Sequence, residues 1–170
     1  MNKFEKIEIA IKLLAQNMWD MKTLWKPTLL HSIRVGMNLL EDWYEENIVL
    51  AGLLHDILED TSIDVNEVRS IFGQKVIDLI IANSKNRELP KDQIDEDLFV
   101  RCLNHWKDAM IIKWYDILDN YKYFFGETKD IQKQNRILDL LKLFVKYLPK
   151  DYNENIFKKL RDTYKVFFYS

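Results

Sequence analysis

The chain has 170 residues, of which 48% are hydrophobic and 31% are charged, and this length predicts one domain over residues 1–170. Its 27 acidic and 25 basic residues give a formal net charge of −2, so it lacks the basic character typical of nucleic-acid binding. Cys102 is the only cysteine, which excludes an intrachain disulfide and a cysteine-based zinc site.

The first residues mix charged and apolar side chains, so they contain no signal-peptide core, and no later stretch is apolar enough to span a membrane. We therefore expect a cytoplasmic protein without a membrane partner. Apolar residues recur at steps of three and four over residues 4–18, which predicts an amphipathic helix. Pro27 suits the first turn of a helix over about 27–45. Residues 47–60 are apolar up to a charged end, which is typical of a central buried helix.

Capping signals mark the next elements. Asp64 and Glu67 form a capping-box pattern before a short helix that Gly73 can end. The polar stretch 83–92 predicts a loop. The remaining helices are expected at 74–83, at about 95–103, 106–125 and 128–148, and after the capping pair Asp151 and Glu154. Since few glycines and prolines are available for turns, the sequence predicts an all-α fold, a single compact bundle of about eight or nine helices.

The most unusual sequence is His55-Asp56-Ile57-Leu58-Glu59-Asp60, which ends the apolar stretch. On a continuous helix Glu59 would lie one turn beyond His55, and Asp60 one turn beyond Asp56. Three carboxylates on one patch repel one another, and burial raises their pKa values, unless a cation compensates. Taken alone, the pattern fits a solvated polar helix end as well as it fits a metal site.

Two further residues favour the metal site. His31 lies on the preceding predicted helix, and antiparallel helices joined by a short turn can bring it opposite His55. Asp116 lies inside an apolar helix, where a buried carboxylate needs a partner. Each residue alone has a plainer interpretation, a hydrogen-bonded histidine or a surface acid. In a chain with three histidines, the order H, HD, D, with each member on a helix, favours one shared metal ion.

The chain resembles the HD-domain superfamily and, more closely, its RelA/SpoT hydrolase branch. The resemblance covers roughly residues 5–150, and the HDxxED pattern separates this branch from many other HD proteins. It implies an HD-domain fold and a metal-dependent phosphohydrolase. The segments that carry it are PTLLHSIRVG at 27–36, AGLLHDILEDT at 51–61, IANSKNR at 81–87 and KWYDILDN at 113–120.

The resemblance also implies roles for individual residues, as ligands of one divalent ion, as a catalytic acid pair and as nucleotide contacts. They are His31, His55, Asp56 and Asp116 for the ion, Glu59 and Asp60 for the acid pair, and Lys22, Lys85 and Asn120 for the nucleotide. Two imidazoles and two carboxylates suit Mn²⁺ first, or Fe²⁺ and similar ions. The arginine–lysine pair that the family carries before its first histidine is matched here by Lys22 and Thr23, so the arginine is replaced.

The leading interpretation is a pyrophosphohydrolase that removes the 3′-pyrophosphate of guanosine tetra- or pentaphosphate. The altered Lys22-Thr23 pair keeps a second interpretation open, an HD-type hydrolase of another nucleotide, such as a nucleoside monophosphate or NADPH. A third is a non-catalytic helical module that binds a nucleotide or a protein. In the first two the partner is a small-molecule nucleotide, and the sequence leaves the oligomeric state open.

Overall fold

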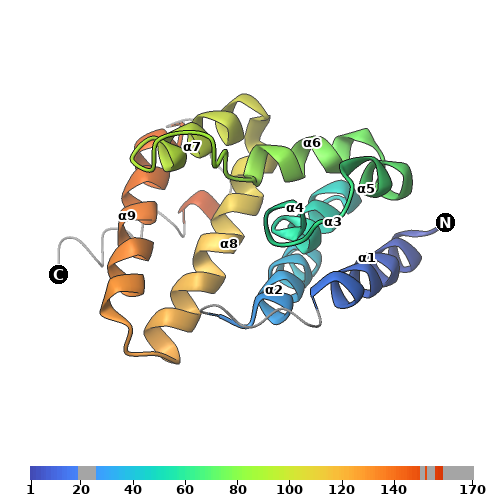
Figure 1. The fold of residues 1–170 in the computed structure, drawn as a ribbon, viewed down its shortest axis with the longest axis horizontal. Coiled ribbons are helices and arrows are strands. Elements are labelled where there is room, and N and C mark those ends of the chain that lie inside the picture. The colour runs from blue at the N-terminus through green and yellow to red at the C-terminus, as the bar shows by residue number, and fades with distance from the viewer. Residues whose placement is uncertain (19–25, 150–151, 153–155, 159–170) are drawn as a thin grey trace.

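A computed structural model describes residues 1–18, 26–149, 152 and 156–158, without the side chain of Trp106. Within these residues the structure contains helices and no strand (Figure 1), so the predicted all-α class is confirmed. The described helices number nine, within the predicted eight or nine. Their bounds are α1 Lys3–Met18, α2 Thr28–Glu41, α3 Glu46–Leu54, α4 Ile57–Asp60, α5 Val65–Phe72, α6 Gln74–Asn83, α7 Ile94–Asn104, α8 Trp106–Gly126 and α9 Ile131–Tyr147.

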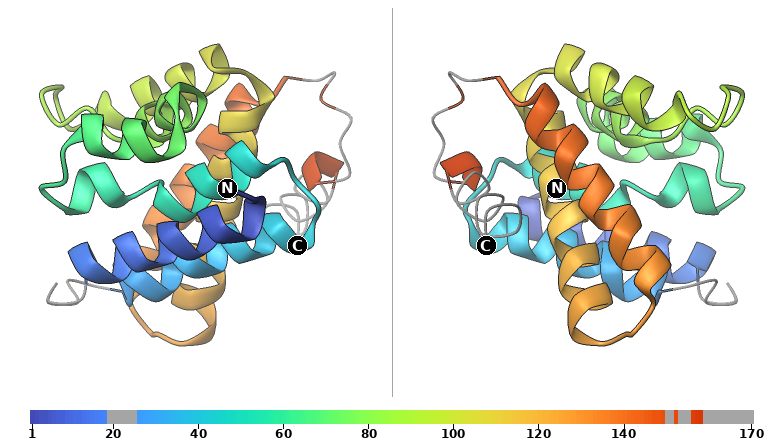
Figure 2. Two further views of the ribbon diagram at one scale, coloured as in Figure 1. Left: turned by 90° about the vertical axis from the view of Figure 1, so that its right-hand side faces the viewer. Right: turned by 90° about the vertical axis from the view of Figure 1, so that its left-hand side faces the viewer.

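Two helices, α3 and α8, form the centre of the bundle (Figures 1 and 2). Every residue of α3 from Ile48 to Leu54 is buried, and a helix that is apolar on all sides must be surrounded by other elements. α3 is in contact with α1, α2, α6 and α8, while α8 also packs against α2, α6, α7 and α9. The predicted central helix is thereby confirmed, and a second one, α8, lies beside it.

A pair of glycines lets α2 and α3 approach closely. A Cβ atom at Gly36 would lie 2.2 Å from Cγ of Leu53, and one at Gly52 would lie 2.3 Å from Cδ1 of Leu39. A side chain at either position would force its neighbour to move, so the two glycines favour this close approach. Because the helices are antiparallel neighbours, the close packing brings the end of α3 next to the first turn of α2, where His31 lies.

Two of the predicted helices end several residues earlier in the structure than expected. α2 ends at Glu41, because the chain turns at Trp43, which has a left-handed φ of 62°. The prediction of one continuous helix over 47–60 is wrong, because His55 and Asp56 separate α3 from α4. There Nδ1 of His55 lies 2.8 Å from the carbonyl oxygen of Gly52. In a continuous helix this oxygen accepts the backbone N–H of Asp56.

The capping signals are largely confirmed. The Asp64 side chain accepts a hydrogen bond from the Asn66 N–H at the start of α5, and Gly73 ends that helix with a φ of 89°. The helix predicted to follow the capping pair at 151 and 154 falls largely outside the described residues. Among the described helices, none has the length and apolar character that a membrane crossing needs.

Candidate metal centre and active site

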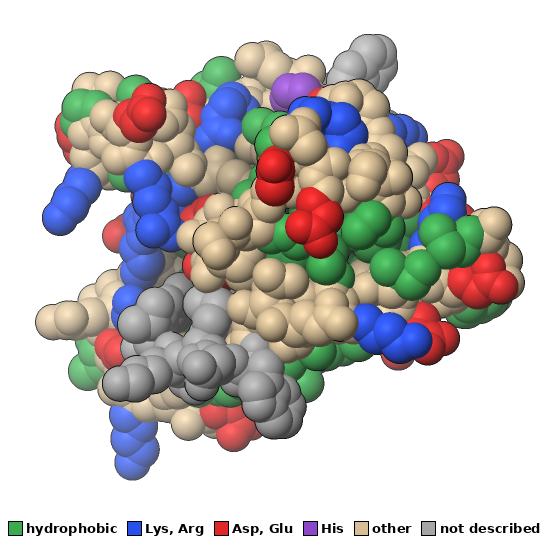
Figure 3. All heavy atoms as spheres, turned by 45° about the vertical axis from the view of Figure 1, so that its right-hand side comes forward, with side chains coloured by type: hydrophobic (Ala, Val, Ile, Leu, Met, Phe, Trp, Pro, Cys, Tyr) green, Lys and Arg blue, Asp and Glu red, His purple; other side chains and the backbone are tan. Residues whose placement is uncertain are grey.

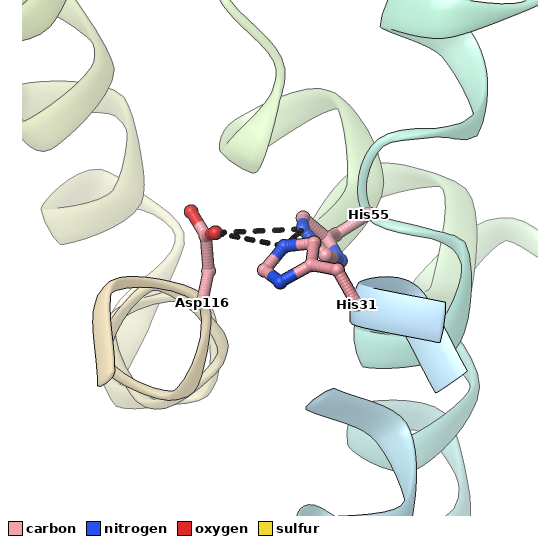
Figure 4. Close-up of side chains that lie close together, drawn as sticks. All are labelled: His31, His55 and Asp116. Atoms are coloured by element: carbon pink, nitrogen blue, oxygen red, sulfur yellow. Dashed lines mark hydrogen bonds and ion pairs between the residues drawn. The ribbon is translucent and has the colours of Figure 1, made fainter. Parts of the chain in front are cut away.

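Three buried side chains from different parts of the chain lie close together (Figure 4). His31 comes from α2, His55 follows α3, and Asp116 lies on α8. The two Nε2 atoms are 3.3 Å apart, and Oδ1 of Asp116 lies 3.2 Å from Nε2 of His31 and 3.7 Å from Nε2 of His55. One donor atom from each residue falls within 4.8 Å of the others, an arrangement that could hold one metal ion.

Asp56, the fourth predicted ligand, lies beside both imidazoles. Its Oδ1 is 3.3 Å from Nε2 of His55, and its Oδ2 is 3.7 Å from Nε2 of His31. The fold therefore brings together all four residues for which the sequence predicts a ligand role, although they are far apart along the chain. The ligand role itself stays a prediction.

Each imidazole is held in place through its other nitrogen. Nδ1 of His55 lies 2.8 Å from the Gly52 carbonyl oxygen, and Nδ1 of His31 lies 2.7 Å from Oδ2 of Asp119. A carbonyl can only accept a hydrogen bond, so Nδ1 of His55 carries a proton, and Nε2 is the ring atom that faces the cluster and would bind a metal ion. The ionised carboxylate of Asp119 also accepts only, so Nδ1 of His31 carries a proton and Nε2 is the ring atom that faces the cluster. Metal-binding histidines are oriented in this way by outer hydrogen bonds.

The cluster attracts positive charge. Burial alone would lower the pKa of His55, but the charges and hydrogen bonds of Asp56 and Asp116 outweigh it and raise the pKa to about 10. Burial would raise the pKa of both carboxyl groups, yet His55 and Lys26 hold the pKa of Asp56 well below its usual value, and Lys113 with the two histidine rings does the same for Asp116. Two imidazole nitrogens and two ionised carboxylates form a mixed N/O donor set, which fits a divalent transition-metal ion in place of the proton.

Two lysines that the sequence reasoning missed are buried beside the carboxylates. Nζ of Lys113 lies 2.8 Å from Oδ2 of Asp116, which turns Oδ1 of that residue toward the histidines. Nζ of Lys26 lies 3.6 Å from Oδ2 of Asp56 and donates to Oδ1 of Asn120 at 3.0 Å. Lys113 could have been found from its position one turn before Asp116. Lys26 could not, because only the tertiary fold brings it to the cluster.

Asp119 is a further residue that the sequence reasoning missed. Besides accepting from His31, it receives two hydrogen bonds from Arg34, at 2.7 and 2.8 Å. Burial would raise the pKa of Asp119, but the Arg34 guanidinium and His31 outweigh it and lower the pKa to about 2. Its spacing from Asp116, one turn along α8, places both acids on the same face of the helix and is the signal that could have revealed it.

The predicted acid pair separates in the structure. Oε1 of Glu59 accepts the backbone N–H of Lys85 at 2.8 Å, and Oε2 lies 3.4 Å from Nζ of Lys85 and 3.7 Å from Arg87. Asp60 instead lines a cavity beside the cluster. Burial, followed by the charges of Asp56 and Glu59, raises the pKa of Asp60. Only Asp60 of the pair therefore faces the space that a substrate would enter.

That cavity has a volume of about 250 Å³ and borders the metal cluster through Asp56 and Asp116. Lys85 and Asn120, two of the predicted nucleotide contacts, line it, whereas Lys22 lies outside the described residues. Its charged lining consists of three acids and twice as many cations: Asp56, Asp60, Asp116, Lys26, Lys85, Arg87, Lys113, Lys133 and Arg136. Figure 3 shows Lys and Arg side chains gathered along the left of the molecule, where the surface is hollowed.

Comparisons with known proteins agree with this geometry. No family model matches the chain. It is 31% identical over 136 residues, 71% of its length, to a probable guanosine-3′,5′-bis(diphosphate) 3′-pyrophosphohydrolase of Mycoplasma pneumoniae, and 29% identical over 95% of its length to the Borreliella burgdorferi protein named guanosine-3′,5′-bis(diphosphate) 3′-pyrophosphohydrolase. These matches cover 18% and 21% of the two relatives, so the chain spans about a fifth of their length.

A solved structure extends the likeness to the fold. A metazoan orthologue of SpoT, described as hydrolysing ppGpp, superposes with a TM-score of 0.78 at 22% identity and covers 96% of both chains. In sequence and in fold, the chain is thus similar to proteins of the RelA/SpoT hydrolase type.

Proposed function

We propose that the chain is a metal-dependent pyrophosphohydrolase that removes the 3′-pyrophosphate of guanosine tetra- or pentaphosphate, with Mn²⁺ as its metal. The observation that carries this proposal is the buried cluster of two histidines and two aspartates that opens into a cavity rich in cations. Such a cavity suits a small polyanion, and the relatives named for this activity support the choice of substrate.

The metal end of the cavity would be formed by residues that are already oriented. His31 and His55 would offer Nε2, while Asp116 would offer Oδ1 and Asp56 a carboxylate oxygen. When bound, the ion supplies positive charge that stabilises the charge developing on the phosphate and makes water a better nucleophile. Because the outer hydrogen bonds fix both rings in advance, little reorganisation is needed at this end.

Asp60 is the residue that we assign to proton transfer. It lines the cavity, and burial together with the charges of Asp56 and Glu59 raises its pKa, which favours its carboxyl group as the proton donor to the ribose 3′ oxygen that leaves when water attacks the phosphate. Glu59 has a different task in this proposal. It holds the backbone and the ammonium group of Lys85, and thereby positions that lysine to meet a phosphate oxygen.

A hydrolase of another doubly phosphorylated nucleotide, such as NADPH, is the second candidate. The observation that favours it is the engagement of Asn120, whose Nδ2 donates to Asp116 at 2.6 Å and whose Oδ1 accepts from Lys26. An amide held on both of its polar atoms has less capacity left to read a guanine base.

A nucleotide panel separates the candidates. Metal-free protein is supplied with Mn²⁺ and given guanosine tetraphosphate, guanosine pentaphosphate, NADPH and nucleoside monophosphates in parallel. We expect release of pyrophosphate with GDP or GTP from the first two. Asp116→Asn is the inactive control, and Asp139→Asn, on the exposed face of α9, is the matched active control. Release of phosphate from NADPH alone would select the second candidate, and inactivity with every nucleotide and divalent ion would contradict both.

A further inference from the structure

The two buried lysines at the metal cluster contact their carboxylates in different ways. Lys113 contacts Oδ2 of Asp116, and the other oxygen of that residue, Oδ1, faces both histidines. Lys26 lies 3.6 Å from Oδ2 of Asp56, and this same oxygen lies 3.7 Å from Nε2 of His31. Lys113 therefore leaves the inner oxygen of its partner to the cluster, whereas Lys26 faces an oxygen that is itself turned toward the histidines.

Lys26 lies between the metal cluster and the cavity. Its side chain is 5% exposed, it lines the cavity together with Asp56, and it donates to Oδ1 of Asn120 at 3.0 Å. The 3.6 Å contact with Asp56 is longer than a hydrogen bond, so it is held by charge rather than by direction. A lysine ammonium is a compact charge on a flexible stem. A small movement would therefore exchange the carboxylate of Asp56 for an anion in the cavity.

The two lysines balance the charge of the two carboxylates that we propose as ligands. Asp56 and Asp116 carry two negative charges, and Lys26 and Lys113 place two positive charges at 3.6 and 2.8 Å from them. A divalent ion would add an excess of positive charge to a site whose histidines are at most 1% exposed, and uncompensated charge is costly in a buried position. An anion in the adjoining cavity would remove this excess, so the ion and an anionic substrate should favour each other's binding.

We propose that Lys26 is an exchangeable countercation, which couples the binding of the metal ion to the binding of the substrate. While Lys26 faces Asp56, its charge weakens the affinity of the cluster for Mn²⁺. A phosphate group in the cavity attracts the ammonium away from Asp56, and the affinity for the ion then rises. The identity of the substrate rests on the proposed function, whereas the effect of Lys26 on metal affinity requires neither a nucleotide nor hydrolysis.

Metal binding without turnover tests the effect of the charge. Mn²⁺ is titrated into metal-free wild-type protein, Lys26→Met and Lys26→Gln, and free Mn²⁺ is measured by electron paramagnetic resonance. Both variants remove the positive charge beside Asp56, and the glutamine keeps a donor for Asn120, so we expect each to bind the ion about ten-fold more tightly. Lys91→Met, at an exposed lysine outside the cavity lining, should bind like wild type. Affinities of the two neutral variants equal to or below that of wild type would overturn the proposal.

A tetrahedral anion tests the exchange itself. Sulfate, which resembles phosphate in shape and charge, is compared with chloride at equal ionic strength in the same titrations. We expect sulfate to raise the Mn²⁺ affinity of the wild type about ten-fold and that of the neutral variants about two-fold or less, because they lack the ammonium that the anion attracts. A gain of equal size in all the proteins, or a wild type that binds no Mn²⁺ in either salt, would contradict the coupling.

Kinetics extend the test to the proposed substrate. We expect Lys26→Met to reach half of its maximal activity at a lower Mn²⁺ concentration than wild type. Its KM for guanosine tetraphosphate should rise about ten-fold, because one charge-assisted contact with phosphate is lost. A lysine that only supports the fold would raise both values when it is replaced, so an increase in both would contradict the exchange. Thermal melting checks that the variants fold.

The binding and kinetic experiments separate failure of the role of Lys26 from failure of the proposed function. If the wild type cleaves no nucleotide but the neutral variants bind Mn²⁺ more tightly and respond less to sulfate, the role of Lys26 stands and the proposed function is wrong. If the wild type cleaves guanosine tetraphosphate and the neutral variants bind Mn²⁺ no more tightly, the role of Lys26 is wrong and the proposed function stands.

Discussion

The two ends of the cavity differ in how firmly their polar groups are held. At the metal end, His31 and His55 are at most 1% exposed, and both rings are fixed through Nδ1 by a neighbouring group. At the end lined by α9, the Arg136 side chain is 46% exposed and has Asp95 as its acidic partner. The comparison indicates that the two histidines proposed as metal ligands are fixed before a substrate arrives, whereas the Arg136 guanidinium remains accessible.

The largest effect should come from the metal end. Asp116→Asn keeps the shape of the side chain but removes the negative charge, so we expect loss of tight Mn²⁺ binding and a fall in kcat/KM of about a thousand-fold or more. The measurements are electron paramagnetic resonance of free Mn²⁺ and the rate of pyrophosphate release. A variant that binds the ion and turns over normally would show that the buried cluster is a structural ion-pair network.

Asp60→Asn should lower the activity and raise the thermal stability of the protein. If Asp60 transfers the proton, kcat falls by about a hundred-fold or more. The pKa of Asp60 is raised in the folded protein, so ionising it costs folding free energy, and this cost appears as the pH rises from its unfolded pKa through its folded pKa. In chelator at neutral pH the variant should therefore melt at a higher temperature than wild type, and at pH 3 the difference should vanish. A lower melting temperature at neutral pH would contradict the assigned environment.

Asp119→Asn tests whether the outer hydrogen bonds matter at the fixed end. The neutral amide is a weaker acceptor for the Nδ1–H of His31 and leaves Arg34 without its ionic partner. Changes at such outer positions weaken metal binding by about 10–100-fold. The measurement is the Mn²⁺ dissociation constant, with Asp130→Asn at the exposed start of α9 as the control. An unchanged constant would show that packing alone orients the ring.

Gly36→Ala should have the smallest effect on chemistry and a clear one on stability. The added Cβ meets Leu53 where α2 and α3 are closest, and overpacking of this kind costs about 1–3 kcal/mol. Gly126→Ala is the matched control, since nothing lies within 4 Å of its added Cβ. Chemical denaturation of both variants gives the comparison. Equal stabilities would mean that the glycine pair does not determine how closely the two helices approach.

The sequence predicts the metal end far better than the rest of the site. His31, His55 and Asp116 could be found because histidines are rare in this chain and because a carboxylate buried in an apolar helix needs a charged or hydrogen-bonding partner. The all-α class and most of the helices follow from periodic apolar positions, as over residues 4–18, and from the continuous apolar stretch that starts at 47.

Other features depend on tertiary structure and could not be predicted. His55 and Asp56 interrupt the predicted helix while their backbone stays in the right-handed helical region, and periodicity does not reveal this interruption or the contact of the His55 ring with the Gly52 carbonyl oxygen. Glu59 and Asp60 are consecutive residues of α4 and point to different sides of it, with Glu59 directed to the backbone of Lys85. Lys133 and Arg136 sit on an amphipathic helix, where charged residues usually face solvent, so only the cavity distinguishes them from an ordinary surface.

The most direct test of the central claim is a metal titration of the chelator-treated protein in the presence of guanosine tetraphosphate. Mn²⁺ is added stepwise while bound metal and released pyrophosphate are measured in the same samples. We predict that metal binding and activity rise together and saturate at one ion per chain, because His31, His55, Asp56 and Asp116 form one cluster. Full activity before any ion is bound, or one tightly bound ion with no hydrolysis, would contradict the account.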